Sequence, residues 1–251
     1  MPSEHQTPEF RQDRFDSEHL GCVAYKLWLR DHTPEASELS KLFDAAGAEL
    51  VCTFSSYSVR NIEVMQRLGF RLIGVRDTYE LSLASEPSVP ALPPDVELVL
   101  AEAGRPPVSR EDLVGLAEAL GAAGRYLKDP GIPRARGLAL YLAWLSNSLH
   151  AGYADAVVLA MRREALLGIH TIRIVDRIAY VDLLGVQASA QGTGLGSALL
   201  ARGLVECAKR GISRVRVVTE NENVGASRFY QRHGFLLCSM ELVWHGHRAP
   251  R

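Results

Sequence analysis

The chain of 251 residues carries 28 lysine and arginine against 29 aspartate and glutamate residues, a formal net charge of -1, and 47% of its residues are hydrophobic. Such a chain can bury a sizeable core but lacks the basic excess that nucleic-acid binding requires, so no nucleic-acid partner is expected. The first 14 residues are polar and no stretch approaches the roughly 20 apolar residues of a membrane span, which favours a cytoplasmic protein without a membrane partner. The dispersed cysteines and histidines predict no metal site, and His245 and His247 are interpreted as part of a solvated tail.

The first third of the chain is predicted to alternate strands and helices. Its hydrophobic patterns predict strands at 21–29, 49–54 and 71–83, the last with a hairpin-like bend, and helices at 35–46 and 59–68. Residues 86–95 then contain four prolines, which remove hydrogen-bond donors and stiffen the backbone. This segment is predicted to be a linker between a first domain at 1–85 and a second domain at 96–251.

The second domain is predicted to contain more strands than the first. The same patterns predict helices at 110–120, 135–148 and 197–209, and strands at 96–101, 156–162, 167–175, 178–186 and 214–220. Strands and helices in this order favour an α/β (α+β) fold.

A glycine-rich turn, Gln191-Gly192-Thr193-Gly194-Leu195-Gly196, separates the strand at 178–186 from the helix at 197–209. Glycines allow the backbone to approach a ligand, and the first N–H groups of the helix stay unpaired, so this turn predicts an anion site suited to a pyrophosphate. It lacks the Lys-Ser/Thr end of a nucleotide-triphosphatase loop and one glycine of the dinucleotide fingerprint.

A second motif follows the strand at 214–220: Asn223-Val224-Gly225-Ala226-Ser227-Arg228-Phe229-Tyr230-Gln231-Arg232-His233-Gly234-Phe235. The first motif resembles the acetyl-CoA pyrophosphate loop of the GCN5-related N-acetyltransferases (GNAT). The second resembles the segment of that family in which an Asn opens a helix that carries a Tyr near the thioester sulfur. The resemblance covers residues 155–245 and implies a GNAT fold, that is, a mixed, mostly antiparallel sheet with flanking helices. It also implies acetyl-CoA as cosubstrate and transfer of an acetyl group to an amine.

The resemblance also implies roles for individual residues. Tyr230 would be the general acid that protonates the departing thiolate, since the ordinary pKa of tyrosine, near 10, is close to that of a thiol. The main chain of Leu184, Gly185 and Val186 would contact the acetyl oxygen and the pantetheine arm. The cofactor-binding set is completed by Gln191, Gly192, Thr193, Gly194, Leu195, Gly196, Ser197 and Asn223, although Asn223 is equally suited to cap its helix.

The general base is indicated only by strand periodicity. Tyr180 and Asp182 alternate with Val181 and Leu183, so both can face a cleft beside the strand. Aspartate is unusual inside a strand, which makes Asp182 the candidate base; a cross-strand ion pair is the alternative. An amine of low pKa would need no base.

An internal repeat links the two domains. Gln66-Arg67-Leu68-Gly69-Phe70 matches residues 231–235, and each copy follows a strand and a helix. The first copy has Met65 where the second has Tyr230, and no glycine-rich turn precedes it. The first domain is therefore predicted to be a smaller, degenerate GNAT-like half-domain with a structural role.

The acceptor is predicted from a whole-chain resemblance. Residues 15–21, and 124–130 before an aromatic helix, give an arrangement similar to the TDP-fucosamine acetyltransferases, which acetylate the 4-amine of a nucleotide-linked (dTDP) 4-amino-4,6-dideoxysugar. This implies a small-molecule amine acceptor, with candidate contacts at Arg125, Tyr126, Lys128, Tyr141, Trp144 and Tyr180. The alternatives are a solvated loop at 124–130, an aminoglycoside, polyamine or peptide acceptor, and a CoA-binding regulator without chemistry. The oligomeric state stays open, a homodimer included.

Overall fold

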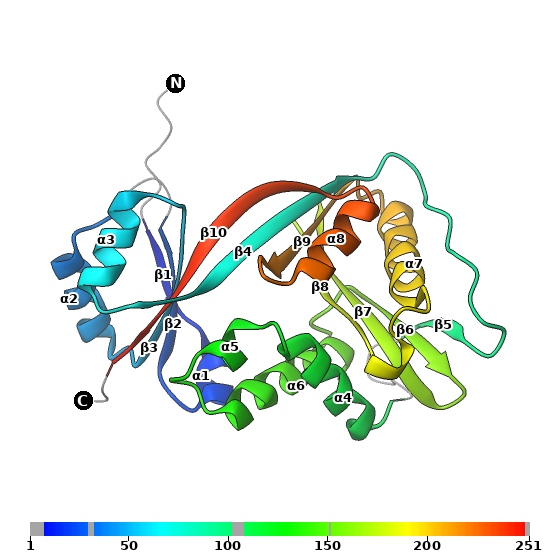
Figure 1. Ribbon diagram of the computed structural model, residues 1–251, viewed down its shortest axis with the longest axis horizontal. Helices are drawn as coiled ribbons and strands as arrows, with labels where there is room; N and C mark the ends of the chain where they lie inside the picture. The colour runs from blue at the N-terminus through cyan, green and yellow to red at the C-terminus, as the bar shows by residue number, and fades with distance from the viewer. Residues whose placement is uncertain (1–7, 30–32, 102–107, 151, 249–251) are drawn as a thin grey trace.

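A mixed sheet of ten strands runs through the described residues in the order β1-β2-β3-β10-β4-β9-β8-β7-β6-β5, with helices packed along it (Figure 1). The computed structural model describes residues 8–29, 33–101, 108–150 and 152–248. The first part contains β1 (Glu9–Gln12), α1 (Arg14–Leu20), β2 (Ala24–Leu29), α2 (Ala36–Ala46), β3 (Leu50–Ser55), α3 (Val59–Arg67) and β4 (Arg71–Ser82). The second part contains β5 (Glu97–Leu100), α4 (Arg110–Gly121), α5 (Arg125–Lys128), α6 (Arg134–His150), β6 (Ala156–Arg162), β7 (Ala165–Val175), β8 (Ile178–Val186), η1 (Ala188–Ala190), α7 (Leu195–Lys209), β9 (Arg214–Glu220), α8 (Val224–Arg232) and β10 (Leu236–His247).

The predicted fold class is confirmed, and so is the order of the predicted elements. Two pairs of neighbouring strands are parallel, β2 with β3 and β8 with β9, while the other pairs in the sheet are antiparallel. Each parallel pair is joined by a helix and followed by a second helix and a long strand. The units β2-α2-β3-α3-β4 and β8-α7-β9-α8-β10 therefore share one topology, which is the structural counterpart of the sequence repeat.

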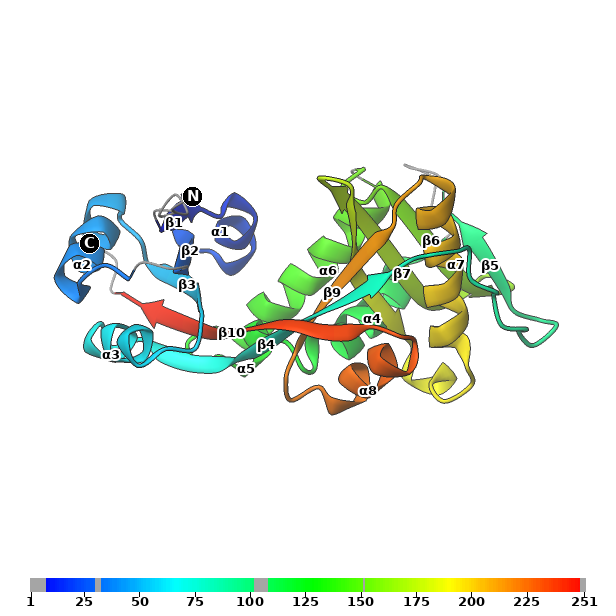
Figure 2. The same cartoon turned by 90° about the horizontal axis from the view of Figure 1, so that it is seen from above.

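The two units exchange their last strands. β10 pairs with β3 through residues 242–247 and with β4 along most of its length, while β4 pairs with β9 on its other edge. Figure 2 shows β4 and β10 crossing together from one half of the molecule to the other. One sheet therefore contains strands from both sides of the proline-rich segment 86–95. A division of the chain into two domains at that segment stays a prediction.

The structure corrects three local predictions. The bend expected in 71–83 is wrong, because β4 is a single strand that pairs with β10 through residues 71–80 and with β9 through residues 76–82. The expected solvated tail at His245 and His247 is also wrong, since both residues belong to β10. The strand expected from residue 21 begins at Ala24, after the unpredicted β1 and the helix α1. The signals for α1 are local: the Asp13 side chain accepts a hydrogen bond from the Asp16 N–H, and Gly21 ends the helix with a φ of 69°.

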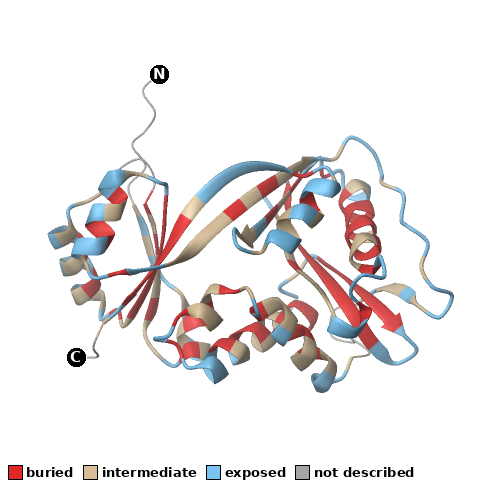
Figure 3. Cartoon of the chain, in the orientation of Figure 1, coloured by how far each residue is buried: buried red, intermediate tan, exposed pale blue. Residues whose placement is uncertain are grey.

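Buried apolar residues are concentrated in β6, β7 and α7 (Figure 3). His170 of β7 lies in this core, where its Nδ1 donates a hydrogen bond to the Leu199 carbonyl of α7 at 3.0 Å. A Cβ on Gly203 of α7 would lie 2.2 Å from the imidazole, so the glycine makes room for the ring. Burial lowers the pKa of His170 to about 4.

The pKa of His170 predicts a loss of stability in mild acid. Because the folded pKa is depressed below its ordinary value near 6.5, the unfolded chain binds more protons between pH 6.5 and pH 4, and stability falls as pH falls through that window. The free energy of unfolding should lose about 2 kcal/mol from this group between pH 7 and pH 5. In His170→Gln, the free energy of unfolding, measured with denaturant, should therefore change less between pH 7 and pH 5 than in the wild type, by that amount. An equal difference in both proteins would contradict the prediction.

Candidate active site

The strands β8 and β9 diverge after four residue pairs. Ile178 to Val181 pair in parallel with Arg214 to Val217, but β8 continues to Val186 and β9 to Glu220 without pairing with each other. β8 remains paired with β7 and β9 with β4 on their outer edges. The inner edge of β8 beyond Val181 therefore faces a gap, where backbone groups that a sheet would pair are free to meet a ligand.

The glycine-rich turn lies beside this gap, at the start of α7. Gly192 and Gly194 have φ values of 76° and 85°, a left-handed conformation in which glycine is favoured. Gly194 is the N-cap of α7 and no side chain caps this end, so the first N–H groups of a 15-residue helix are available to an anion. The loop is held in place by Gln191 Nε2, which donates to the Val186 carbonyl, and by Thr193 Oγ1, which donates to the Ala190 carbonyl.

A cavity of about 490 Å³ opens over this turn. Its lining comprises Leu184, Val186, Ala190, Gln191, Gly192, Gly194, Leu195, Gly196 and Ser197, together with Gly225, Ala226, Phe229, Tyr230 and Arg232 of α8. We call it the loop cavity. Most of the predicted cofactor-binding residues thus line one cavity, with three exceptions: Gly185 packs against Leu120, Thr193 bonds within the loop, and Asn223 caps α8 through the Ala226 N–H.

Valine at position 194 should weaken acetyl-CoA binding. A β-branched residue strongly disfavours a φ of 85°, so the turn and the N–H groups after it should be displaced. The dissociation constant of acetyl-CoA measured by calorimetry should rise at least tenfold, about 1.4 kcal/mol. Gly211→Val is the matched control, because Gly211 has a φ of 68° in the turn after α7 and lines none of the cavities described here. Equal weakening by both variants would attribute the effect to general strain.

Tyr230 connects the loop cavity with a second cavity of about 330 Å³ at the β8–β9 gap, which we call the gap cavity. The Tyr230 side chain is 6% exposed and packs edge-on against Phe229 and Phe235. Burial raises the pKa of Tyr230 well above its ordinary value. The phenol therefore stays protonated at neutral pH.

Two carboxylates line the gap cavity together with Tyr230. Asp182 accepts a hydrogen bond from Trp144 Nε1 at 2.9 Å, and Glu220 lies 4.0 Å from the Arg125 guanidinium. Burial raises the pKa of both Asp182 and Glu220, although the Trp144 bond and the Arg125 charge oppose the shift. A carboxylate with a raised pKa is a stronger base than an ordinary one, so either group can accept a proton from an amine.

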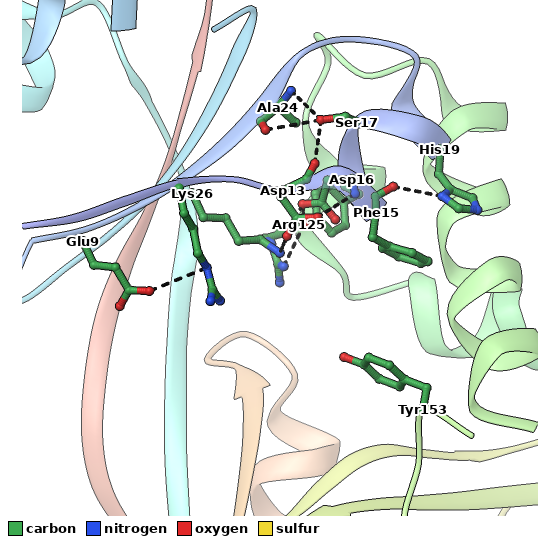
Figure 4. A network of polar contacts seen from close by, with 12 residues as sticks. Glu9, Asp13, Phe15, Asp16, Ser17, His19, Ala24, Lys26, Arg125 and Tyr153 are labelled. Carbon is green, nitrogen blue, oxygen red and sulfur yellow. Dashed lines mark hydrogen bonds and ion pairs between the residues drawn. The ribbon is translucent and has the colours of Figure 1, made fainter. Parts of the chain in front are cut away.

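A third cavity, of about 290 Å³, lies where the first half of the chain meets α5 and α6. We call it the seam cavity; it is lined by Asp13, Phe15, Asp16, Lys26, Arg125, Tyr126, Leu140, Trp144, Asn147 and Tyr153. Figure 4 shows Asp13, Asp16 and Arg125 close together at this seam, with Tyr153 across from them. Arg125 and Trp144 also line the gap cavity, so the two cavities adjoin.

The charged groups of the seam cavity form one connected network. Lys26 Nζ lies 2.5 Å from Asp13 Oδ2 and 3.3 Å from Asp16 Oδ2. The Tyr126 hydroxyl donates to Asp16 and accepts from Arg125. The sequence patterns did not indicate Asp13, Asp16 or Lys26 as site residues; Asp16 lies 110 residues from its partner Tyr126 in the chain.

The residues predicted to contact the acceptor do not all lie in one cavity. The gap cavity is lined by the predicted contacts Arg125, Tyr141, Trp144 and Tyr180, together with Tyr230 and the predicted base Asp182. Tyr126 is buried, with its hydroxyl held by Asp16 and Arg125. Lys128 forms an ion pair with Glu222 and lines none of the three cavities.

Comparison with known proteins agrees with this geometry. The acetyltransferase (GNAT) family matches residues 127–235. A mycothiol acetyltransferase of Actinosynnema mirum is 35% identical over 173 residues, which is 67% of this chain and 54% of that protein. A mycothiol acetyltransferase of Clavibacter michiganensis subsp. michiganensis is 38% identical over 94 residues, or 36% of this chain and 31% of that protein. The chain thus spans about half or less of the length of these curated relatives.

Solved structures agree in fold. A GCN5-related N-acetyltransferase from Sphaerobacter thermophilus superposes with a TM-score of 0.62 at 16% identity, over 96% of this chain and 76% of that one. A tandem GNAT protein from the clavulanic acid biosynthesis pathway gives 0.61 at 15% identity, over 92% and 77%. Within the described ranges, no helix has the length and hydrophobicity needed to span a bilayer. The chain thus has the GNAT fold, and its residues 127–235 match the acetyltransferase (GNAT) family.

Proposed function

We propose that this protein transfers the acetyl group of acetyl-CoA to a primary amine of a small molecule. The observation that carries the proposal is the position of Tyr230, at the junction of the loop cavity and the gap cavity. A pyrophosphate bound by the uncapped start of α7 would direct the thioester arm along the loop cavity toward this tyrosine. The family match and the acetyltransferase names of the relatives support the same reaction.

The gap cavity supplies the other groups that the reaction requires. Acetyl transfer needs a neutral amine, a polarised carbonyl and a proton for the departing thiolate. Asp182 or Glu220 accepts the proton of the amine, and the free inner edge of β8 beyond Val181 offers N–H groups to the carbonyl oxygen. As the amine nitrogen bonds to the carbonyl carbon and the carbon–sulfur bond breaks, Tyr230 protonates the sulfur.

The acceptor extends from the gap cavity into the seam cavity. The cations there are largely neutralised: Lys26 contacts two carboxylates, and Arg125 lies between Glu220 and the hydroxyl of Tyr126. This balance of charge favours a compact, hydroxylated amine. A mycothiol precursor with a free amine is one candidate, because the names of the relatives contain mycothiol. A nucleotide-linked amino sugar is the second candidate, because the guanidinium groups of Arg76 and Arg125 both line the gap cavity.

The proposal is tested by release of free CoA from acetyl-CoA with a panel of amines. The panel contains free amino sugars, nucleotide-linked amino sugars, mycothiol precursors that carry a free amine, aminoglycosides and peptides. Acetylation of a small amine is the expected outcome. Tight binding of acetyl-CoA without turnover of any amine would favour a CoA-binding regulator instead.

Removal of one charge distinguishes the two acceptor candidates. Arg125→Gln should raise the acceptor KM at least tenfold if the acceptor carries a diphosphate, and should change it little for an acceptor without one. For a polycationic amine the KM should fall, since nearby carboxylates lose their counter-charge. Lys128→Gln is the matched control, because it removes a cation of α5 that lies outside the three cavities. The KM for acetyl-CoA should stay constant in both variants.

A further inference from the structure

Three side chains of types that can bind a metal ion meet at the end of α5. Asp129 follows α5, and His245 and His247 lie near the end of β10. Asp129 Oδ2 accepts hydrogen bonds from His245 Nδ1 at 2.6 Å and from His247 Nε2 at 2.7 Å. The three ligand atoms lie within 4.8 Å of one another, so one small cation could contact all of them.

The chemistry of the donors selects the class of ion. Two imidazole nitrogens and one carboxylate oxygen suit Zn²⁺ and similar divalent transition metals, whose bonds to such ligands are about 2.0–2.2 Å long. Mg²⁺ and Ca²⁺ prefer oxygen ligands and larger coordination numbers. Asp129 and His245 are buried, whereas the His247 side chain is 39% exposed, so water can reach the open coordination position beside it.

The surroundings are compatible with coordination. The Gly131 N–H donates to Asp129 Oδ1 at 2.8 Å, which orients the carboxylate and leaves Oδ2 directed at the histidines. A Cβ on Gly131 would lie 2.5 Å from His247 Nε2, so only glycine leaves this side of the nitrogen open. When His245 Nδ1 binds a metal, it gives up its hydrogen bond to Asp129, and its proton moves to the buried Nε2.

We propose that Asp129, His245 and His247 bind one divalent transition-metal ion such as Zn²⁺, with water as the remaining ligand. The ion replaces the two shared hydrogens, and the side chains readjust around it: bonds of about 2.0–2.2 Å require each N–O distance to lengthen by about 0.6 Å from its present 2.6 or 2.7 Å. The ligands come from two segments 116 and 118 residues apart. The ion thus joins the turn after α5 to the end of β10, which pairs with β3 in the first half of the chain. Asp129 lies four residues after Arg125. The bound ion therefore also stabilises the turn of α5, whose Arg125 lines the seam and gap cavities.

Metal binding is measured on the full chain without acetyl-CoA or an acceptor, so the result is independent of the proposed enzymatic activity. After treatment with a chelator, the protein is titrated with Zn²⁺ by calorimetry and with Co²⁺ by visible absorption. One equivalent should bind, and the Co²⁺ bands should have the intensity of a four- or five-coordinate site. The melting temperature should rise with Zn²⁺ concentration and not with an equal concentration of Mg²⁺.

Substitution of one ligand locates the ion. His247→Ala removes a partly exposed ligand that a folded chain can lose, and it should weaken Zn²⁺ binding at least tenfold and abolish the shift in melting temperature. His150→Ala is the matched control, since His150 is exposed at the end of α6 and outside the cluster. The proposal is overturned if the wild type binds no equivalent of Zn²⁺ or Co²⁺, or if His247→Ala binds the ion as tightly as the wild type.

Discussion

Tyr230→Phe should lower the turnover number by roughly 10²- to 10⁴-fold, the range over which a general acid usually contributes. The substitution keeps the ring, which packs against Phe229 and Phe235, and removes only the hydroxyl. Burial is what raises the pKa of Tyr230, so the lost group is a protonated phenol at neutral pH. Steady-state kinetics measure the change, and calorimetry should find the affinity for acetyl-CoA nearly unchanged.

Tyr79→Phe provides the comparison for this result. Tyr79 is a buried tyrosine of the same apolar cluster, but it lines none of the three cavities. Its loss of a hydroxyl should leave turnover close to that of the wild type. Wild-type turnover in Tyr230→Phe would assign the proton transfer to water or to another residue.

Met65→Ala should destabilise the protein by about 2–5 kcal/mol, as expected for truncation of a fully buried methionine. Met65 occupies in the first half of the chain the position that Tyr230 occupies in the second. Its cluster includes Leu242 and Trp244 of β10, so the cavity left by the substitution affects the exchanged strand as well. Denaturant unfolding measures the loss of stability.

Turnover per folded molecule should nevertheless remain near the wild-type value in Met65→Ala, because Met65 lines none of the three cavities. Met240→Ala is the matched control: this methionine of β10 is 54% exposed, and its truncation should change the free energy of unfolding by less than about 0.5 kcal/mol. A large loss of turnover in fully folded Met65→Ala would show that the first half of the chain is coupled to the chemical step.

The local elements and the loop cavity could be predicted from the sequence because their causes lie within a few residues. The φ values of Gly192 and Gly194 follow from a glycine-rich turn between a strand and a helix, and Asn223 caps α8 through an amide three residues away. The helices and strands could also be predicted locally, because the spacing of hydrophobic residues within one element shows which of its faces is buried. The repeat of Gln-Arg-x-Gly-Phe also predicted two units of one topology.

The exchange of β4 and β10, the seam cavity and the Asp129 cluster were decided by the tertiary structure. Each depends on contacts between residues more than 100 positions apart, such as Tyr126 with Asp16 and His245 with Asp129. A single sequence carries no signal for such pairs, because the local sequence around each residue does not depend on the position of its distant partner. His245 and His247 illustrate the difference: in the sequence they are two polar residues near a terminus, and in the folded chain strand pairing with β3 brings them to a buried carboxylate.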